Sequence, residues 1–227
     1  MASLATPVTL YVRPAHAREK MNSNDMVRDG IYYAAGLVAA GLTLAYFTPW
    51  PFAVPLFLLA LFCLYFFRDP DRAIPDGAVA VSPADGRVVS VKADAPGRTR
   101  ISIFLNIFDV HVNRTPISGK IVDVEYHEGK FLVASKEGAS AQNEQNVLTV
   151  EGDGTRVVFT QIAGLIARRI VCWKKRGDTV KVGERIGLIK FGSRVDVFFG
   201  PEWDVAVSVR DRVSAGSSII ARRKRGA

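Results

Sequence analysis

The sequence predicts a mainly β fold, a barrel-sandwich domain of β-hairpins preceded by a hydrophobic helical hairpin. Two observations lead to this prediction. Residues 31–67 contain no charged side chain and are interrupted in the middle by prolines. After residue 68, short runs of alternating apolar and polar residues are separated by Gly, Asp and Pro, the pattern of strands joined by tight turns.

The charge-free stretch consists of two apolar runs, residues 31–47 and 52–67, on either side of Pro49-Trp50-Pro51. Each run falls just short of the ~20 residues that a straight helix needs to cross a bilayer. Trp50 suits the headgroup level. We therefore expect either two short spans or a re-entrant wedge. A buried hairpin in the core of a soluble protein is the alternative, and a cleaved signal peptide is disfavoured because the stretch begins late and runs too long.

Basic residues flank the stretch on both sides, which places both flanks on the cytoplasmic side by the positive-inside rule. They are Arg18, Lys20 and Arg28 before it and Arg68 and Arg72 after it. Residues 1–30 form a polar N-terminal segment, in which Met21 and Met26 are alternative start positions.

The predicted β domain covers residues 68–227. Three of its segments, ADGRVVSV, ISGKIVDV and RGDTVKVGERIGLI, share a glycine in a tight turn before a strand. This pattern is typical of small sandwiched hairpin barrels, including the lipoyl and biotinyl carrier modules. The chain ends in the basic sequence ARRKRGA, which is either a solvated end or a contact to anionic lipid.

The formal net charge of +8 fits an anionic partner, either nucleic acid, a lipid surface or a phosphorylated substrate. No helix-turn-helix, zinc-finger or RNA-recognition pattern supports nucleic acid. Cys63 and Cys172 lie far apart in the sequence and are expected to be reduced packing residues. The three histidines, His16, His111 and His127, lack a metal-ligand spacing, so we expect no metal cofactor.

Three short motifs carry residues suited to chemistry: Asp85 in PADG, His111 in DVHVNR and Ser193 in FGSR. An acid, a histidine and a serine are the ingredients of an activated nucleophile. Each also has an ordinary structural interpretation, as a turn aspartate, a half-buried histidine and a common Gly-Ser pair. The serine is not in a GxSxG elbow, which argues against α/β-hydrolase chemistry.

Together, in this order, the motifs resemble the phosphatidylserine decarboxylase family in its short class. The resemblance extends from about Arg68 to Pro201 and rests on four stretches, which are SPADGRV, FDVHVNRTPISG, QIAGLIARRI and GDTVKVGERIGLIKFGSRVDVF. The hydrophobic hairpin before them also fits this family.

The resemblance implies that the chain is a proenzyme that cuts itself between Gly192 and Ser193, giving a β chain of residues 1–192 and an α chain of residues 193–227. The serine oxygen would attack the Gly192 carbonyl to form an ester. Elimination would leave a dehydroalanine, which hydrolyses to a pyruvoyl group and ammonia. Glycine suits the acyl side because it has no Cβ and tolerates strained turns.

The resemblance also implies the roles of the other two residues. His111 would be the base that activates Ser193, with Asp85 orienting the imidazole. The pyruvoyl group would form a Schiff base with the amine of phosphatidylserine and accept the electrons released with CO2, giving phosphatidylethanolamine. His111 would protonate the resulting carbanion. The expected location is the cytoplasmic face of a bacterial inner membrane, with an anionic membrane surface as partner and a homo-oligomeric state.

One departure from the family concerns position 114, where the longer class carries a second histidine and this chain has Arg114. Arg114 and Arg194 are candidates to bind the lipid phosphate or the carboxylate, because arginine matches both bidentately. Asn113 is a weaker polar candidate. Two alternatives to the main interpretation stay open, a membrane-tethered adaptor of the lipoyl or biotinyl type and a decarboxylase of a related serine phospholipid.

Overall fold

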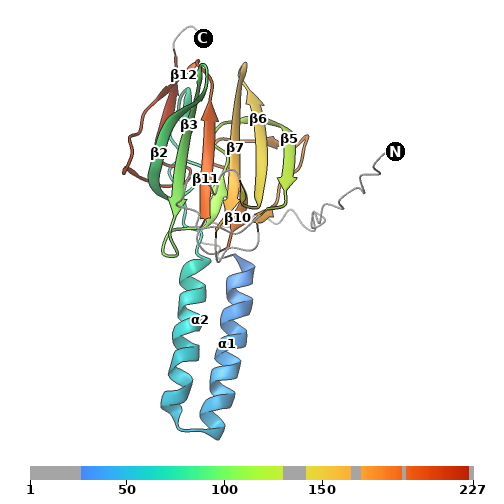
Figure 1. Ribbon diagram of the computed structural model, residues 1–227. Coiled ribbons are helices and arrows are strands. Elements are labelled where there is room, and N and C mark those ends of the chain that lie inside the picture. Colours follow the sequence, from blue (N-terminus) through green and yellow to red (C-terminus); the bar gives the residue numbers. More distant parts are fainter. Residues whose placement is uncertain (1–26, 130–141, 165–169, 191–192, 225–227) are drawn as a thin grey trace, which may run out of the picture.

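The molecule consists of a pair of antiparallel helices and a β domain at one end of that pair (Figure 1). The structure is a computed structural model that describes residues 27–129, 142–164, 170–190 and 193–224. Most of the predicted N-terminal segment 1–30, including Met21 and Met26, lies outside the described residues.

The charge-free stretch forms the two helices. Helix α1 spans Arg28–Phe47, the short 3-10 helix η1 spans Trp50–Ala53, and helix α2 spans Val54–Phe66. The turn lies at the predicted Pro49-Trp50-Pro51 break, where proline cannot continue a helix. By length and composition, α1 is the one helix of the described residues that is long and apolar enough to cross a membrane, and the apolar stretch Trp50–Phe66 is shorter.

The two helices approach closely at glycines of α1. A Cβ on Gly30 would lie 2.4 Å from Cβ of Phe67, and one on Gly41 would lie 2.8 Å from the ring of Phe57. The absence of side chains at these positions lets the helix backbones approach. The backbone N–H of Val27 also donates to the carbonyl of Phe67 at 3.0 Å, which ties the start of α1 to the end of α2.

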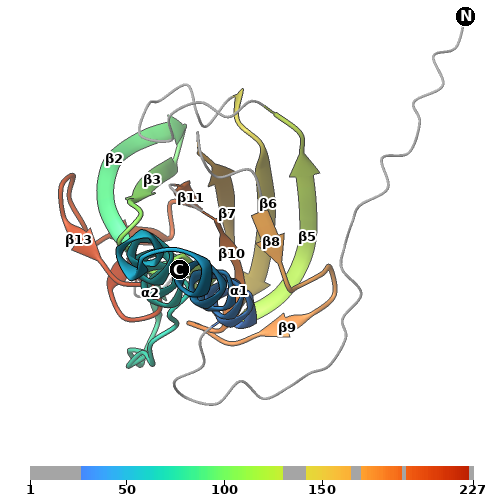
Figure 2. The same ribbon diagram turned by 90° about the horizontal axis from the view of Figure 1, so that it is seen from below.

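The β domain is built around one curled sheet with the strand order β13-β2-β3-β11-β7-β6-β5-β9 (Figure 2). Every strand pair in this sheet is antiparallel. The bounds are β2 Gly86–Ala95, β3 Arg98–Leu105, β5 Gly119–His127, β6 Gln145–Gly152, β7 Thr155–Ala163, β9 Thr179–Val180, β11 Ser193–Phe199 and β13 Arg212–Val213.

Two three-stranded sheets complete the domain. One has the order β4-β10-β8, with bounds Val112–Arg114, Arg185–Ile189 and Ile170–Cys172. The other has the order β1-β14-β12, with bounds Val79–Val81, Ile219–Arg223 and Trp203–Val205. The sheets enclose a core whose fully buried members include Ile101, Ile103, Leu105, Leu148, Phe159, Val195, Val197 and Phe199.

The predicted fold class, a mainly β sandwich-like domain after an N-terminal helix pair, is confirmed. The predicted glycine turns coincide with strand starts, since Gly86 begins β2 and Gly119 begins β5. Gly86 has a φ of +146°, and a Cβ there would lie 2.2 Å from the carbonyl oxygen of Phe104, so only glycine fits this position. Both cysteines, Cys63 and Cys172, are free thiols.

Candidate active site

Ser193 is the first residue of β11, which is an inner strand of the large sheet. It pairs with Leu105 of β3 and with Ala163 of β7. Alternation along the strand places its side chain on the same face as Val195 and Val197, which belong to the core. Ser193 is fully buried, and its hydroxyl has no hydrogen-bond partner among the described residues.

A buried hydroxyl without a partner costs about 1–3 kcal/mol, so such a group in a folded protein calls for an explanation. Retention of a reactive serine is one explanation. The residue before it, Gly192, is the other half of the predicted cleavage site and lies outside the described residues.

His111 precedes β4 and is 2% exposed. Its Nδ1 lies 2.9 Å from the carbonyl oxygen of Asp109. Because a carbonyl only accepts hydrogen bonds, Nδ1 carries the proton, and Nε2 is the basic nitrogen of this tautomer. On one side the imidazole packs against Phe66, the last residue of α2, with ring centroids 4.2 Å apart.

The environment of His111 keeps its imidazole neutral. Burial lowers the pKa of His111 from 6.5 to about 4, the hydrogen bond to the Asp109 carbonyl opposes this shift, and the positive charge of Arg68 adds to it. A neutral imidazole is a proton acceptor at every pH near 7.

His111 and Ser193 lie at the same end of the β domain, the end that faces the helices. The backbone N–H of Ile189, four residues before Ser193, donates to the carbonyl of His111 at 3.3 Å. On the other side, Leu105 pairs with Ser193 in the sheet, six residues before His111. The structure therefore brings the predicted base and the predicted nucleophile to one region from two parts of the chain, one containing Leu105 and His111 and the other containing Ile189 and Ser193.

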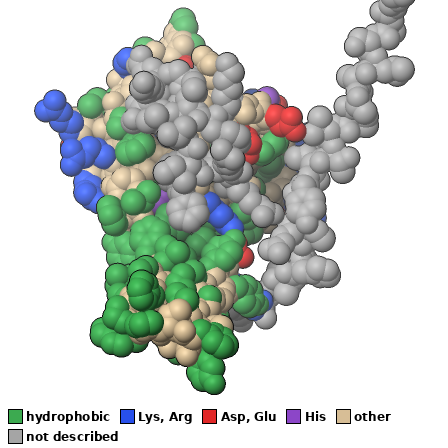
Figure 3. Space-filling view, turned by 60° about the horizontal axis from the view of Figure 1, so that its bottom comes forward, with side chains coloured by type: hydrophobic (Ala, Val, Ile, Leu, Met, Phe, Trp, Pro, Cys, Tyr) green, Lys and Arg blue, Asp and Glu red, His purple; other side chains and the backbone are tan. Residues whose placement is uncertain are grey.

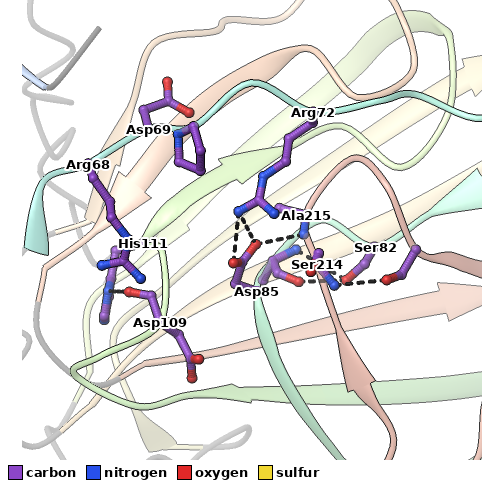
Figure 4. Close-up of polar contacts among 12 residues, drawn as sticks. Arg68, Asp69, Arg72, Ser82, Asp85, Asp109, His111, Ser214 and Ala215 are labelled. Atoms are coloured by element: carbon purple, nitrogen blue, oxygen red, sulfur yellow. Dashed lines mark hydrogen bonds and ion pairs between the residues drawn. The ribbon is translucent and has the colours of Figure 1, made fainter. Parts of the chain in front are cut away.

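Asp85 has different partners from the predicted one. Its carboxylate accepts two hydrogen bonds from Arg72, at 2.9 and 2.8 Å, and one from the backbone N–H of Ala215 at 2.7 Å. Figure 4 shows Asp85 with these residues and apart from His111. The contact that orients the imidazole comes from the backbone carbonyl of Asp109 instead. The orienting role of Asp85 stays a prediction, and the described contacts of Asp85 do not include His111.

Asp109 holds the loop before His111 in place. One carboxylate oxygen accepts the backbone N–H of Asn106 at 2.9 Å, and the other accepts a hydrogen bond from Arg212 at 2.8 Å. Sequence reasoning missed this residue, although its position two residues before His111 in the DVH motif was a usable signal.

Arg114 and Arg194, the predicted binders of phosphate or carboxylate, are both buried in ion pairs. Arg114 contacts Asp69 at 2.8 Å and also donates to the carbonyl of Gly183 at 3.1 Å. Arg194 pairs with Asp196 at 2.6 Å. In this structure both guanidinium groups hold parts of the protein together, and their role in substrate binding stays a prediction.

Asn113 belongs to a buried row of amides. Its Oδ1 accepts a hydrogen bond from Gln161 at 2.9 Å, and Gln161 in turn accepts one from Asn146 at 3.0 Å. The Nδ2 of Asn113 has no partner among the described residues. Gln161 pairs with Val195, two residues after Ser193 in β11, so the amide row lies further along this strand than Ser193.

The structure describes no group of three His, Cys, Asp or Glu side chains that could hold a metal.

Comparison with known proteins gives the class of the enzyme, which is a decarboxylase and thus a carboxy-lyase. More particularly, the chain belongs to the phosphatidylserine decarboxylase family, whose sequence model matches residues 59–221.

Proteins named phosphatidylserine decarboxylase proenzyme are close relatives of this chain. One from Solibacter usitatus is 67% identical over 198 residues, which cover 87% of this chain and 97% of the relative. One from Nitratidesulfovibrio vulgaris is 47% identical, covering 81% and 88%, and one from Syntrophus aciditrophicus is 45% identical, covering 85% and 95%. The predicted family is therefore confirmed.

Proposed function

We propose that the chain is a proenzyme that cleaves itself between Gly192 and Ser193 and then decarboxylates phosphatidylserine to phosphatidylethanolamine. The observation that carries the proposal is the hydroxyl of Ser193. It is buried, has no hydrogen-bond partner among the residues that the structure describes, and lies at the end of the β domain that holds a neutral histidine. The names of the relatives support the substrate and the proenzyme state.

In the proposed cleavage, His111 takes the hydroxyl proton of Ser193 as the oxygen attacks the carbonyl carbon of Gly192. His111 passes this proton to the backbone nitrogen of Ser193 as the peptide C–N bond breaks, and an ester forms. Loss of the Cα proton of Ser193 then expels the Gly192 carboxylate and leaves a dehydroalanine. One water molecule converts this to a pyruvoyl group and ammonia, so that the balance is one water consumed and one ammonia released.

The surroundings of Ser193 fit such a group. The position is fully buried, and in the sheet it lies between Leu105 of β3 and Ala163 of β7. A pyruvoyl group at this position supplies an electron-accepting carbonyl to the substrate amine. His111 begins as a proton acceptor, and after accepting a proton it is an imidazolium able to donate it to carbon at the same place.

The helix pair supports attachment to a membrane. Large apolar side chains on it are exposed, among them Tyr32, Leu42, Tyr46, Phe47, Trp50, Phe52, Leu58 and Leu61. Figure 3 shows this apolar surface covering the part of the molecule below the β domain. Contiguous exposed apolar surface of this kind marks a membrane or protein contact. We propose that residues 31–67 hold the β domain, residues 68–227, on the cytoplasmic face of the membrane as a homo-oligomer.

Intact mass and denaturing electrophoresis of the purified protein test the cleavage. We expect two pieces, the smaller one of 35 residues (227 − 192) with a pyruvoyl start. The Ser193→Ala variant is expected to stay a single chain and to release no CO2 from phosphatidylserine. Ser90→Ala is a matched control, because Ser90 is also buried and its hydroxyl has no partner in the described part of the chain, but it lies within β2. An uncut wild-type chain that releases CO2 would exclude the pyruvoyl route.

A further inference from the structure

Arg68 lies at the boundary between the helix pair and the β domain, two residues after the end of α2. One guanidinium nitrogen donates to the carbonyl of Tyr65 at 2.7 Å, and another donates to the carbonyl of Phe108 at 2.7 Å. The guanidinium carbon lies 3.8 Å from the ring centroid of Tyr65. The cation is thus held in one place by two carbonyls and an aromatic face.

The charge of Arg68 has no carboxylate partner in the part of the chain that the structure describes. Other cations of this region are paired, Arg72 with Asp85 and Lys190 with Asp29, each at 2.8 Å. An arginine with fixed geometry and an uncompensated charge is suited to binding an external anion, because its planar fork matches phosphate and carboxylate.

The surface around Arg68 is apolar on the side of the helices. Tyr65, Phe108 and Ile107 are 46%, 60% and 37% exposed, respectively. In Figure 3 the apolar surface of the helix pair borders on basic side chains at the base of the β domain. If the helix pair lies in the bilayer, this border falls at the level of the lipid headgroups, where aromatic and basic side chains gather.

Arg68 also lies next to the candidate active site. Figure 4 shows its guanidinium beside the imidazole of His111, whose protonation its charge disfavours. Exposure falls from the partly exposed Arg68 through His111 at 2% to Ser193 at 0%. The three residues therefore lie at increasing depth, from the boundary of the helix pair into the core of the β domain.

We propose that Arg68 binds the phosphodiester of the lipid substrate at the membrane boundary. In a serine phospholipid the phosphate lies between the acyl chains and the serine. A phosphate held at Arg68 keeps the acyl chains beside the helix pair and directs the amine and carboxylate inward toward Ser193. The other two candidate arginines, Arg114 and Arg194, already have buried carboxylate partners. This inference rests on the proposed function, since it names the group that holds the substrate.

The test is steady-state kinetics of the full-length, self-cleaved enzyme in mixed micelles with varied mole fractions of phosphatidylserine. We expect Arg68→Gln to raise KM about tenfold or more, because one hydrogen bond to a charged group is lost. The kcat is expected to stay within about twofold of the wild type. Arg68→Lys retains the charge without the fork and is expected to recover part of the affinity.

A second measurement uses phosphatidylglycerol, a phosphodiester lipid without amine or carboxylate, as an inhibitor. We expect it to compete with phosphatidylserine in the wild type and to lose most of its effect in Arg68→Gln. Inorganic phosphate is expected to inhibit neither, because the site lies at a lipid surface. Arg98→Gln is the matched control. The guanidinium carbon of Arg98 lies 4.3 Å from the ring centroid of Phe198, and Arg98 lies at the end of β3 opposite to Leu105. Its kinetics are expected to equal those of the wild type.

The outcomes separate this inference from the proposed function. If the wild type releases CO2 and Arg68→Gln has the same KM and the same inhibition, Arg68 only caps α2 and the inference is wrong. The same conclusion follows if Arg98→Gln raises KM as much as Arg68→Gln does. A wild type that releases no CO2 from phosphatidylserine overturns the proposed function itself. If Arg68→Gln does not fold, Arg68→Lys replaces it in both measurements, and an unchanged KM and inhibition there also overturn the inference.

Discussion

The imidazole of His111 packs against the ring of Phe66, with centroids 4.2 Å apart and planes inclined by 35°. Phe66 is the last residue of the apolar helix pair, and His111 is the candidate base of the β domain. The same helix end touches the loop before His111, because the hydroxyl of Tyr65 donates to the carbonyl of Phe108 at 3.2 Å. The helix pair is therefore part of the wall around the base.

Replacement of Phe66 by alanine is expected to open this wall. Water reaching His111 would raise the pKa of the imidazole toward its ordinary value of 6.5, since burial is the main cause of the lowered value. We expect self-cleavage of Phe66→Ala to slow below pH 6, where the wild type retains its rate. Phe62→Ala is a suitable control, because Phe62 contacts Phe66 one turn earlier in α2. Equal pH profiles for Phe66→Ala and the wild type would contradict this role.

The pKa of His111 predicts how self-cleavage depends on pH. With a pKa of about 4, His111 stays in its basic form from pH 8 down to about pH 5, so the cleavage rate should be nearly constant in this range. A histidine with a pKa of 6.5 would lose about tenfold in rate between pH 7.5 and 5.5. The measurement is the rate of appearance of the 35-residue fragment after synthesis in vitro. His111→Ala should abolish cleavage, whereas His127→Ala, which removes an exposed histidine paired with Glu125, should not.

The lowered pKa of His111 also predicts how the stability of the fold depends on pH. Between pH 6.5 and about pH 4 the unfolded chain binds a proton at His111 that the folded chain does not bind. The contribution of the neutral imidazole is therefore complete above pH 6.5 and decreases as the pH falls through this window. In the uncut Ser193→Ala protein, replacing His111 by glutamine should flatten the fall of the unfolding midpoint between pH 7 and pH 5.

The sequence was sufficient to predict the helix pair and the β class, because these depend on local patterns such as a charge-free run. The role of Ser193 came from the resemblance of the ordered motifs to a family, and it stays a prediction. The sequence did not predict the partners of Asp85 and Arg114. Those contacts join positions 13 and 45 residues apart, and they depend on how the linker after α2 folds back. Arginine has the same chemistry toward a buried carboxylate and toward a lipid phosphate, so the residue type alone did not distinguish the two.

Asp85 and Arg72 provide a test of the predicted orienting role. If Asp85 acts only through its ion pair, Asp85→Asn and Arg72→Gln should each lower stability by about 1–3 kcal/mol and leave self-cleavage unchanged. If Asp85 also acts on His111 during the reaction, Asp85→Asn alone should slow cleavage. Urea unfolding and the cleavage rate, measured on the same two variants, separate these possibilities.

Asp69 connects the end of the helix pair to the β domain, and its side chain is fully buried. It pairs with Arg114 at 2.8 Å and also with Arg185. Asp69→Asn would leave Arg114 buried without a compensating charge, which typically costs about 3–5 kcal/mol. We expect a large drop in the unfolding midpoint of the uncut Ser193→Ala protein, measured in detergent by urea titration.

The control for Asp69 is Glu151→Gln, which removes an ion pair with Arg156 on the surface of the β domain. Exposed pairs contribute at most about 1 kcal/mol, so this variant should unfold at nearly the same urea concentration as the parent. The kinetics give a second distinction. Because Asp69 and Arg114 act on the fold, any Asp69→Asn enzyme that matures should keep its KM for phosphatidylserine, in contrast to Arg68→Gln. A KM raised about tenfold in Asp69→Asn would instead indicate that Arg114 binds the substrate.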